Sequence, residues 1–179
     1  MRVLRSFAKK KDGATAVEFA LIGLPFFALF LSCFEMGLLF IRMAMLDHAV
    51  NTTSKSVYIG TVTQGLANNT VSSDDLEQDI CDLVGVVVPN CANNITIELT
   101  EIDNLVDLPD TDAVCRDEGD EFEPVVNFNP GAGTSIVFMR ACVTTDVYTP
   151  GLGFGLELSK TDNNRFEIIS SMAFMNEPF

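Results

Sequence analysis

An apolar run near the N-terminus restricts the fold of this chain more than any other feature. Residues 19–34 carry no charged side chain, and with Glu35 admitted the run extends to Ile41, which makes 23 residues. About 20 residues of helix cross the hydrocarbon core of a bilayer. The lysines at positions 9–11 precede the run, so the positive-inside rule predicts a cytoplasmic N-terminus. We expect a transmembrane segment at about residues 19–41.

Charge is divided sharply along the chain. Five of the eleven Lys and Arg residues lie before Gly13, whereas residues 14–179 carry six basic and 24 acidic side chains, a balance of 6 − 24 = −18. Nucleic-acid phosphates repel such a chain, so no nucleic-acid partner is expected. The single histidine, His48, has no Cys or His nearby, so a nucleophilic mechanism lacks its base. We expect no enzymatic activity, no cofactor and no metal.

Other fates of a basic and apolar N-terminus fit less well. A secretory signal peptide ends at a small-residue site after a shorter apolar core, but here the run continues into FEMGLLFIR. The FLSC stretch at residues 30–33 is superficially like a lipoprotein site, yet MGLLFI follows shortly after it instead of a polar tether. We therefore interpret Cys33 as a buried, apolar helix residue.

The sequence around Glu18 suggests proteolytic processing. Gly13 is followed by four residues, then by Glu18 and Phe19, between the basic leader and the apolar run. This pattern resembles the processing site of type IV pilin-like proteins of the Flp and Tad branch. The resemblance implies that a prepilin peptidase cuts after Gly13, which leaves Ala14 as the new N-terminus and Glu18 as the fifth mature residue.

Glu18 then has a physical explanation. A carboxylate inside hydrocarbon costs roughly 2.5 to 3.5 kcal/mol on insertion scales. Cleavage exposes a cationic amine at Ala14, with which Glu18 of a neighbouring subunit can pair, and buried charges are tolerated chiefly when they are paired. Phe19 belongs to the same assembly segment. A second interpretation remains open, in which Glu18 merely reaches the headgroups from a position just inside the membrane.

Three further residues of the run are candidates for assembly or helix shape. Glu35 falls near the outer membrane interface, and Arg42 lies seven residues later on the same helix face. The Glu35 carboxylate either reaches water at the helix end or makes an intersubunit contact, for which Arg42 is also a candidate. Pro25 lacks a backbone N–H, so we expect it to kink or loosen the helix.

The rest of the chain reads as the second half of a long helix followed by a small head. Apolar residues continue at spacings of three and four beyond Arg42, which predicts one helix from about residue 15 to residue 59. A loop is expected at 60–72 and a short helix from Ser72 or Ser73. Alternating patterns predict strands, and these lie at residues 94–101, 135–147 and 165–175, with a turn-rich link at 150–155.

Four cysteines lie in this head, at positions 81, 91, 115 and 142. An even count in an exported domain predicts two disulfides with three connectivities, and the oxidising environment would preserve them. The pairing Cys81–Cys91 and Cys115–Cys142 is favoured because each bridge joins sequence neighbours. No pair has CxxC spacing, which argues against a metal. The acidic loop at 107–124 is read as solvated, although a cation site there is the alternative.

The stretch GATAVEFALIGLPFFALFLSCFEMGLLF resembles the TadE-like family of minor pilins, or pseudopilins, of the Tad (Flp) type IV pilus. The C-terminal NEPF is also similar to the tail of many such proteins. The resemblance implies insertion into the bacterial inner membrane, a periplasmic C-terminal domain, and later a place in the pilus at the cell surface. It also implies partners: the prepilin peptidase, other major and minor pilins, and the inner-membrane assembly platform.

The sequence thus predicts an α+β protein in three parts: a cleaved leader (1–13), a pilin-like helix (14–59) and a disulfide-stabilised head with an antiparallel sheet (60–179). The predicted function is that of a minor pilin needed for pilus assembly, secretion and surface adhesion. The alternative is a permanently anchored membrane protein or lipoprotein whose acidic periplasmic domain binds a ligand or cation.

Overall fold

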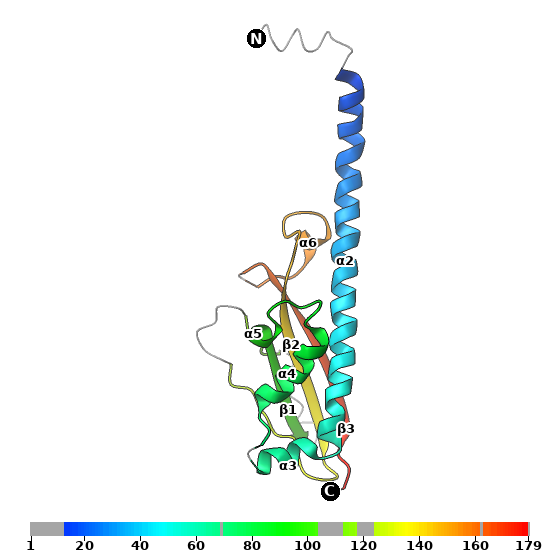
Figure 1. The fold of residues 1–179 in the computed structure, drawn as a ribbon. Helices are drawn as coiled ribbons and strands as arrows, with labels where there is room; N and C mark the ends of the chain where they lie inside the picture. Colours follow the sequence, from blue (N-terminus) through cyan, green and yellow to red (C-terminus); the bar gives the residue numbers. More distant parts are fainter. Residues whose placement is uncertain (1–12, 69, 104–112, 118–123, 162, 179) are drawn as a thin grey trace. The chain divides into compact units, whose positions relative to one another are not determined.

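The computed structural model describes residues 13–68, 70–103, 113–117, 124–161 and 163–178. It consists of a long N-terminal helix, a three-stranded antiparallel sheet and short helices, as Figure 1 shows. The predicted α+β class is therefore confirmed. The chain divides into two compact units. One contains the helix up to Met36 and the segment Tyr148–Leu158; the other contains Gly37–Val147 and Ser159–Phe179.

The long helix, α2, comprises Ala14–Tyr58 and has 45 residues, or about 68 Å at 1.5 Å per residue. Its bounds lie within one residue of those expected. The helix runs through Pro25 without interruption, and a kink there stays a prediction. It ends where Gly60 adopts a left-handed conformation with φ of 77°, which a residue without Cβ adopts at no steric cost.

The expected loop at residues 60–72 is wrong in part, because it contains a helix, α3 (Thr61–Ala67). The left-handed turn at Gly60 redirects the chain, and α3 then buries Val62 and Gly65. A Cβ on Gly65 would collide with the Val71 side chain. The missing side chain thus lets the returning chain pack on α3, a tertiary contact that local polarity does not reveal.

Helix α4 (Ser73–Val84) begins where the capping signal was expected. The Ser72 side chain and the Asp75 carboxylate form a reciprocal capping box, which satisfies backbone N–H groups that the first turn leaves free. The backbone N–H of Ser72 donates to Asp75 Oδ2 at 2.7 Å. This bond, and that from the Ser72 hydroxyl, lower the pKa of Asp75.

The sheet has the strand order β1-β2-β3, and both pairings are antiparallel. Its strands are β1 (Ile95–Ile102), β2 (Ile136–Asp146) and β3 (Arg165–Met175). All three expected strands are present. Two short helices complete the described elements, α5 (Cys91–Asn94) before β1 and α6 (Phe154–Glu157) between β2 and β3.

The core of the head lies between the sheet, α4 and the second half of α2. Burial of each large aliphatic side chain contributes about 1.5 to 3 kcal/mol. The buried aliphatic positions of α2 recur at helical spacing and are Leu39, Leu46, Ala49, Val50 and Val57. Those of α4 are Leu76, Ile80 and Val84, and those of β1 are Ile95, Ile97 and Leu99.

Two disulfides connect the head internally. Cys81 of α4 is bonded to Cys91 of α5, and Cys115 is bonded to Cys142 of β2. This is the connectivity that the sequence favoured. The second bridge attaches the segment that follows β1 to the central strand.

A buried arginine on β3 organises one end of the sheet. Arg165 is 5% exposed, and its Nη1 donates to Asn94 Oδ1 at 2.8 Å and to Asp117 Oδ1 at 2.9 Å. Burial acts to raise the pKa of Asp117, but hydrogen bonds from Asn163, Arg165 and Thr161, with the charge of Arg165, lower it overall. Asp117 is therefore held as a carboxylate.

Candidate processing and assembly site

The expected cleavage point lies at the start of α2. Gly13 is exposed and directly precedes Ala14, the first residue of α2. A Cβ built on Gly13 would meet no described atom within 4 Å. The backbone around the Gly13–Ala14 bond is therefore open on the glycine side.

Glu18 and Phe19 are both exposed, and the Phe19 side chain has 70% of its surface accessible. Within the described residues, Glu18 makes no hydrogen bond or ion pair. Its charge thus has no counterpart in the described part of its own chain. Pairing with a neighbouring amine and contact with headgroups both stay predictions.

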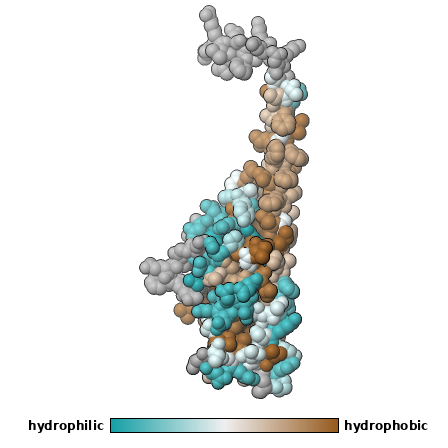
Figure 2. Space-filling view, in the orientation of Figure 1, coloured by the Kyte–Doolittle hydropathy of each residue, from teal (hydrophilic) through white to brown (hydrophobic). Residues whose placement is uncertain are grey.

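The first half of α2 presents apolar side chains on all sides, and Figure 2 shows this surface on the face it displays. The mean hydropathy of the most apolar window is 2.1, and only 6% of that window is buried inside the protein. A helix that is apolar all round belongs in a core or a membrane. By length and composition, α2 can cross a membrane. The exposed side chains are Val17, Phe19, Leu21, Ile22, Leu24, Phe26, Phe27, Leu29, Phe30 and Phe34.

Cys33 lies on this apolar surface and is a free, exposed thiol. The expectation that it is buried is wrong for the chain alone, because no other described segment covers that side of the helix. Its apolar neighbours Phe30 and Phe34 are exposed as well.

Glu35 is buried and hydrogen-bonded within its own chain. Its side chain is 0% exposed, so the expectation that it reaches water is wrong. Oε1 accepts the backbone N–H of Tyr148 at 3.0 Å, and Oε2 accepts the N–H of Thr149 at 3.0 Å and the Thr149 hydroxyl at 3.1 Å. Both oxygens are thus used within the chain. The structure gives Glu35 a sufficient role without a second subunit, and the intersubunit contact stays a prediction.

Ser32 lies about one turn before Glu35 and binds Phe154, a few residues after Thr149 in the segment that follows β2. Its hydroxyl donates to the carbonyl of Ala28 at 2.7 Å and accepts the N–H of Phe154 at 3.2 Å. Gly153 has φ of 56°, and a Cβ there would collide with Ser32 Oγ. Only glycine allows so close an approach to the helix. We call Tyr148–Leu158 the docked loop; Figure 1 shows it with α6 beside α2.

Arg42 also has partners inside its own chain. It is 2% exposed, its Nε donates to the carbonyl of Val87 at 2.9 Å, and its Nη1 donates to the carbonyl of Asp146 at 3.0 Å. The guanidinium thus connects the end of β2 to the turn after α4 by hydrogen bonds. The intersubunit role of Arg42 stays a prediction, and its burial argues against it.

The sequence did not predict which residues donate hydrogen bonds to Glu35 and Ser32. Tyr148, Thr149 and Phe154 donate backbone N–H groups, which any residue type except proline supplies, and only Thr149 adds a side-chain hydroxyl. The available signal was the absence of charge from Val147 to Leu156, in a chain with 25 acidic residues. The sequence therefore did not reveal that this uncharged loop packs on α2 through Ser32 and Glu35.

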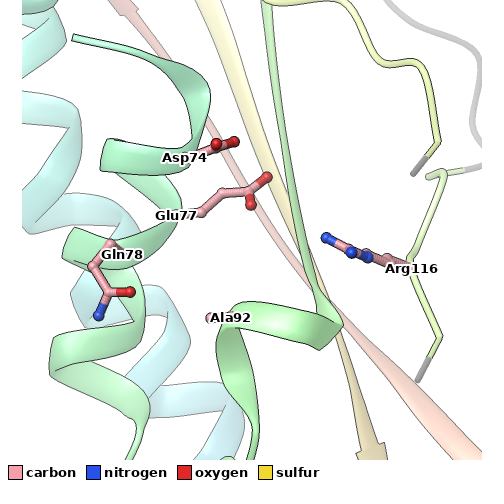
Figure 3. A pocket seen from close by; sticks show the side chains of 5 residues that line it. All are labelled: Asp74, Glu77, Gln78, Ala92 and Arg116. Carbon is pink, nitrogen blue, oxygen red and sulfur yellow. The ribbon is translucent and has the colours of Figure 1, made fainter. Parts of the chain in front are cut away.

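A shallow polar hollow lies on the head between α4, α5 and the segment that contains Arg116. Asp74, Glu77, Gln78, Ala92 and Arg116 line it, and Figure 3 shows the side chains of Glu77 and Arg116 pointing toward each other. Among the residues that the structure describes, no three His, Cys, Asp or Glu side chains could hold a metal ion. The acidic loop at 107–124 lies largely outside the described residues, so a cation site there stays a prediction.

A comparison with protein families identifies the N-terminal segment. Residues 13–54 match the TadE-like protein family. The match begins at the expected processing glycine and covers Glu18, Pro25, Glu35 and Arg42. The resemblance to TadE-like proteins is thereby confirmed, and it indicates a protein associated with the Tad pilus. Searches of curated proteins and of solved structures returned no match.

Proposed function

We propose that this chain is a minor pilin, or pseudopilin, of a Tad-type pilus, inserted with its N-terminus in the cytoplasm and cleaved after Gly13. The observation that carries the proposal is the coincidence of three boundaries. The TadE-like match begins at residue 13, α2 begins at Ala14, and the apolar surface begins within the first turns of α2. After a cut between Gly13 and Ala14, the mature chain would begin with the first residue of α2.

The chemistry of assembly follows from the new terminus. Cleavage gives Ala14 a cationic amine, and Glu18 lies four residues later, about 6 Å along the helix axis. The Glu18 carboxylate has no described counterpart in its own chain, so a neighbouring amine can neutralise it when apolar helices pack together. A paired charge in lipid specifies register more than it adds stability. The packed helices form the shaft, and the oxidised head faces the periplasm and later the pilus surface.

The native N-terminus tests the processing step directly. Mass spectrometry of the protein from piliated cells should give a mature chain that begins at Ala14. The control is a strain without the prepilin peptidase, in which the chain should retain Met1. An intact leader in wild-type cells would refute the proposal and favour a permanently anchored protein with an acidic binding domain.

Substitution of Glu18 tests the assembly step. Glu18→Ala should leave cleavage and membrane insertion intact and reduce incorporation into sheared pili. Asp47→Ala is the matched control, because Asp47 is an exposed acid farther along the same helix. Normal piliation by Glu18→Ala would restrict Glu18 to contact with headgroups.

A further inference from the structure

We propose that the docked loop, Tyr148–Leu158, is a second membrane contact, which lies in the outer-leaflet interface beside α2. The inference rests on the proposed function, because it requires α2 to be the membrane anchor. The exposed surface of the loop contacts lipid at the boundary between headgroups and acyl chains.

The docked loop exposes aromatic and aliphatic side chains. Tyr148 is 57% exposed, Leu152 42% and Leu156 57%. No charged residue lies between Asp146 and Glu157. Three large side chains with apolar surface are thus exposed within nine residues, and exposed apolar surface is a common sign of a protein or membrane contact. An aromatic side chain with a polar tip is typical of membrane interfaces.

The docked loop is bound to α2 at a level that matches the end of a membrane span. The loop donates hydrogen bonds to Ser32 and Glu35, and Gly153 lies close to Ser32. From Thr15 to Phe34 the helix rises about 30 Å, the thickness of a hydrocarbon core. A span that starts near the processing site therefore ends at the level of the loop. This span lies closer to the N-terminus than the expected 19–41.

Several backbone N–H groups of the docked loop are hydrogen-bonded within the protein. Irregular backbone near hydrocarbon is tolerated only where its polar groups are satisfied within the protein. The N–H groups of Tyr148 and Thr149 donate to Glu35, and that of Phe154 donates to Ser32. Those of Leu152 and Leu156 donate to the carbonyls of residues 149 and 153 at 3.2 Å. Five N–H groups of the loop are thus bonded within the protein, while the two glycines at 151 and 153 and the apolar side chains are exposed.

The absence of tryptophan from the chain allows a direct test by fluorescence. Four single-tryptophan variants of the full chain are reconstituted into vesicles of phosphatidylethanolamine and phosphatidylglycerol. The acyl chains carry bromine, a contact quencher, either near the headgroup or near the chain end. Leu152→Trp and Leu156→Trp report on the loop, Phe26→Trp reports on the middle of the anchor, and Val125→Trp is the control on an exposed apolar residue of the head, 99% exposed.

The proposal expects a loss of emission at positions 152 and 156 that is larger with bromine near the headgroup than with bromine near the chain end. Position 26 should show the reverse order, and position 125 should lose nothing. If position 26 is quenched while 152 and 156 behave like 125, the loop contact is refuted and the membrane anchor stands. If position 26 is not quenched, both the anchor and the loop contact fail.

A second copy of the chain is the competing occupant. In that case, emission at positions 152 and 156 would depend on the ratio of protein to lipid and not on bromine. This outcome would overturn the lipid contact and assign the surface to subunit packing.

Discussion

Replacement of Glu35 by glutamine should release the docked loop from α2. Glutamine keeps the shape of the side chain but offers one acceptor oxygen, and its NH₂ group faces a backbone N–H where Glu35 has its second oxygen. At least one of the three hydrogen bonds, with Tyr148 or Thr149, is lost. A hydrogen bond to a charged group contributes about 1.5 to 3 kcal/mol.

The cost converts to a measurable rate. Because 1.4 kcal/mol is tenfold in an equilibrium constant, local opening of the loop should increase about 10-fold to 150-fold. Hydrogen exchange of the full chain in lipid nanodiscs, followed by mass spectrometry of peptides that contain Tyr148 and Thr149, measures this opening. These two amides should exchange faster by that factor.

The control is Glu18→Gln, the same change at an exposed carboxylate of the same helix. It should leave exchange in the docked loop unaltered. Protection at residues 148 and 149 that is equal in Glu35→Gln and wild type would refute the reasoning, since it would mean that the carboxylate does not hold the loop.

Two further predictions concern the head. Replacing both Cys115 and Cys142 by serine should lower the free energy of unfolding by about 3.5 kcal/mol, and replacing Cys81 and Cys91 by about 2.7 kcal/mol, because the closed loops span 27 and 10 residues. Urea unfolding of the two variants measures the difference. Equal midpoints would contradict the loop-entropy account. Asp117→Asn should destabilise the head by about 2 kcal/mol at neutral pH; because the pKa of Asp117 is lowered in the folded state, its contribution is present above the ordinary Asp pKa of about 3.9 and is lost as the pH falls through the folded value. Unfolding curves of wild type and variant should therefore converge in acid, and a constant gap would show that the carboxylate charge is not the cause.

Much of the fold could be predicted from local patterns. Alternation at Ile95, Ile97 and Leu99 predicts β1, and a polar cap before two acids predicts the start of α4. These signals are local, because a strand face and a helix terminus each depend on residues only a few positions apart. The TadE-like resemblance was likewise contained within one continuous stretch.

The environment of Glu35 could not be predicted in the same way. A helix pattern fixes how far Glu35 lies along the axis, but two of its three hydrogen-bond partners are backbone N–H groups 113 and 114 positions downstream, and the third is the Thr149 hydroxyl. Any residue type can supply a backbone N–H. The same reason explains the missed α3, whose place depends on the contact between Gly65 and Val71, which only the folded chain brings about.

The bridge between Cys115 and Cys142 has a consequence for cleavage of the chain by proteases. A protease that hydrolyses one peptide bond anywhere between these two positions cannot separate the fragments, since a covalent link still joins them. The strand that carries Cys142 would keep its place against its neighbours on either side. A nicked molecule would therefore go unnoticed on a non-reducing gel and fall into two bands only after a thiol is added.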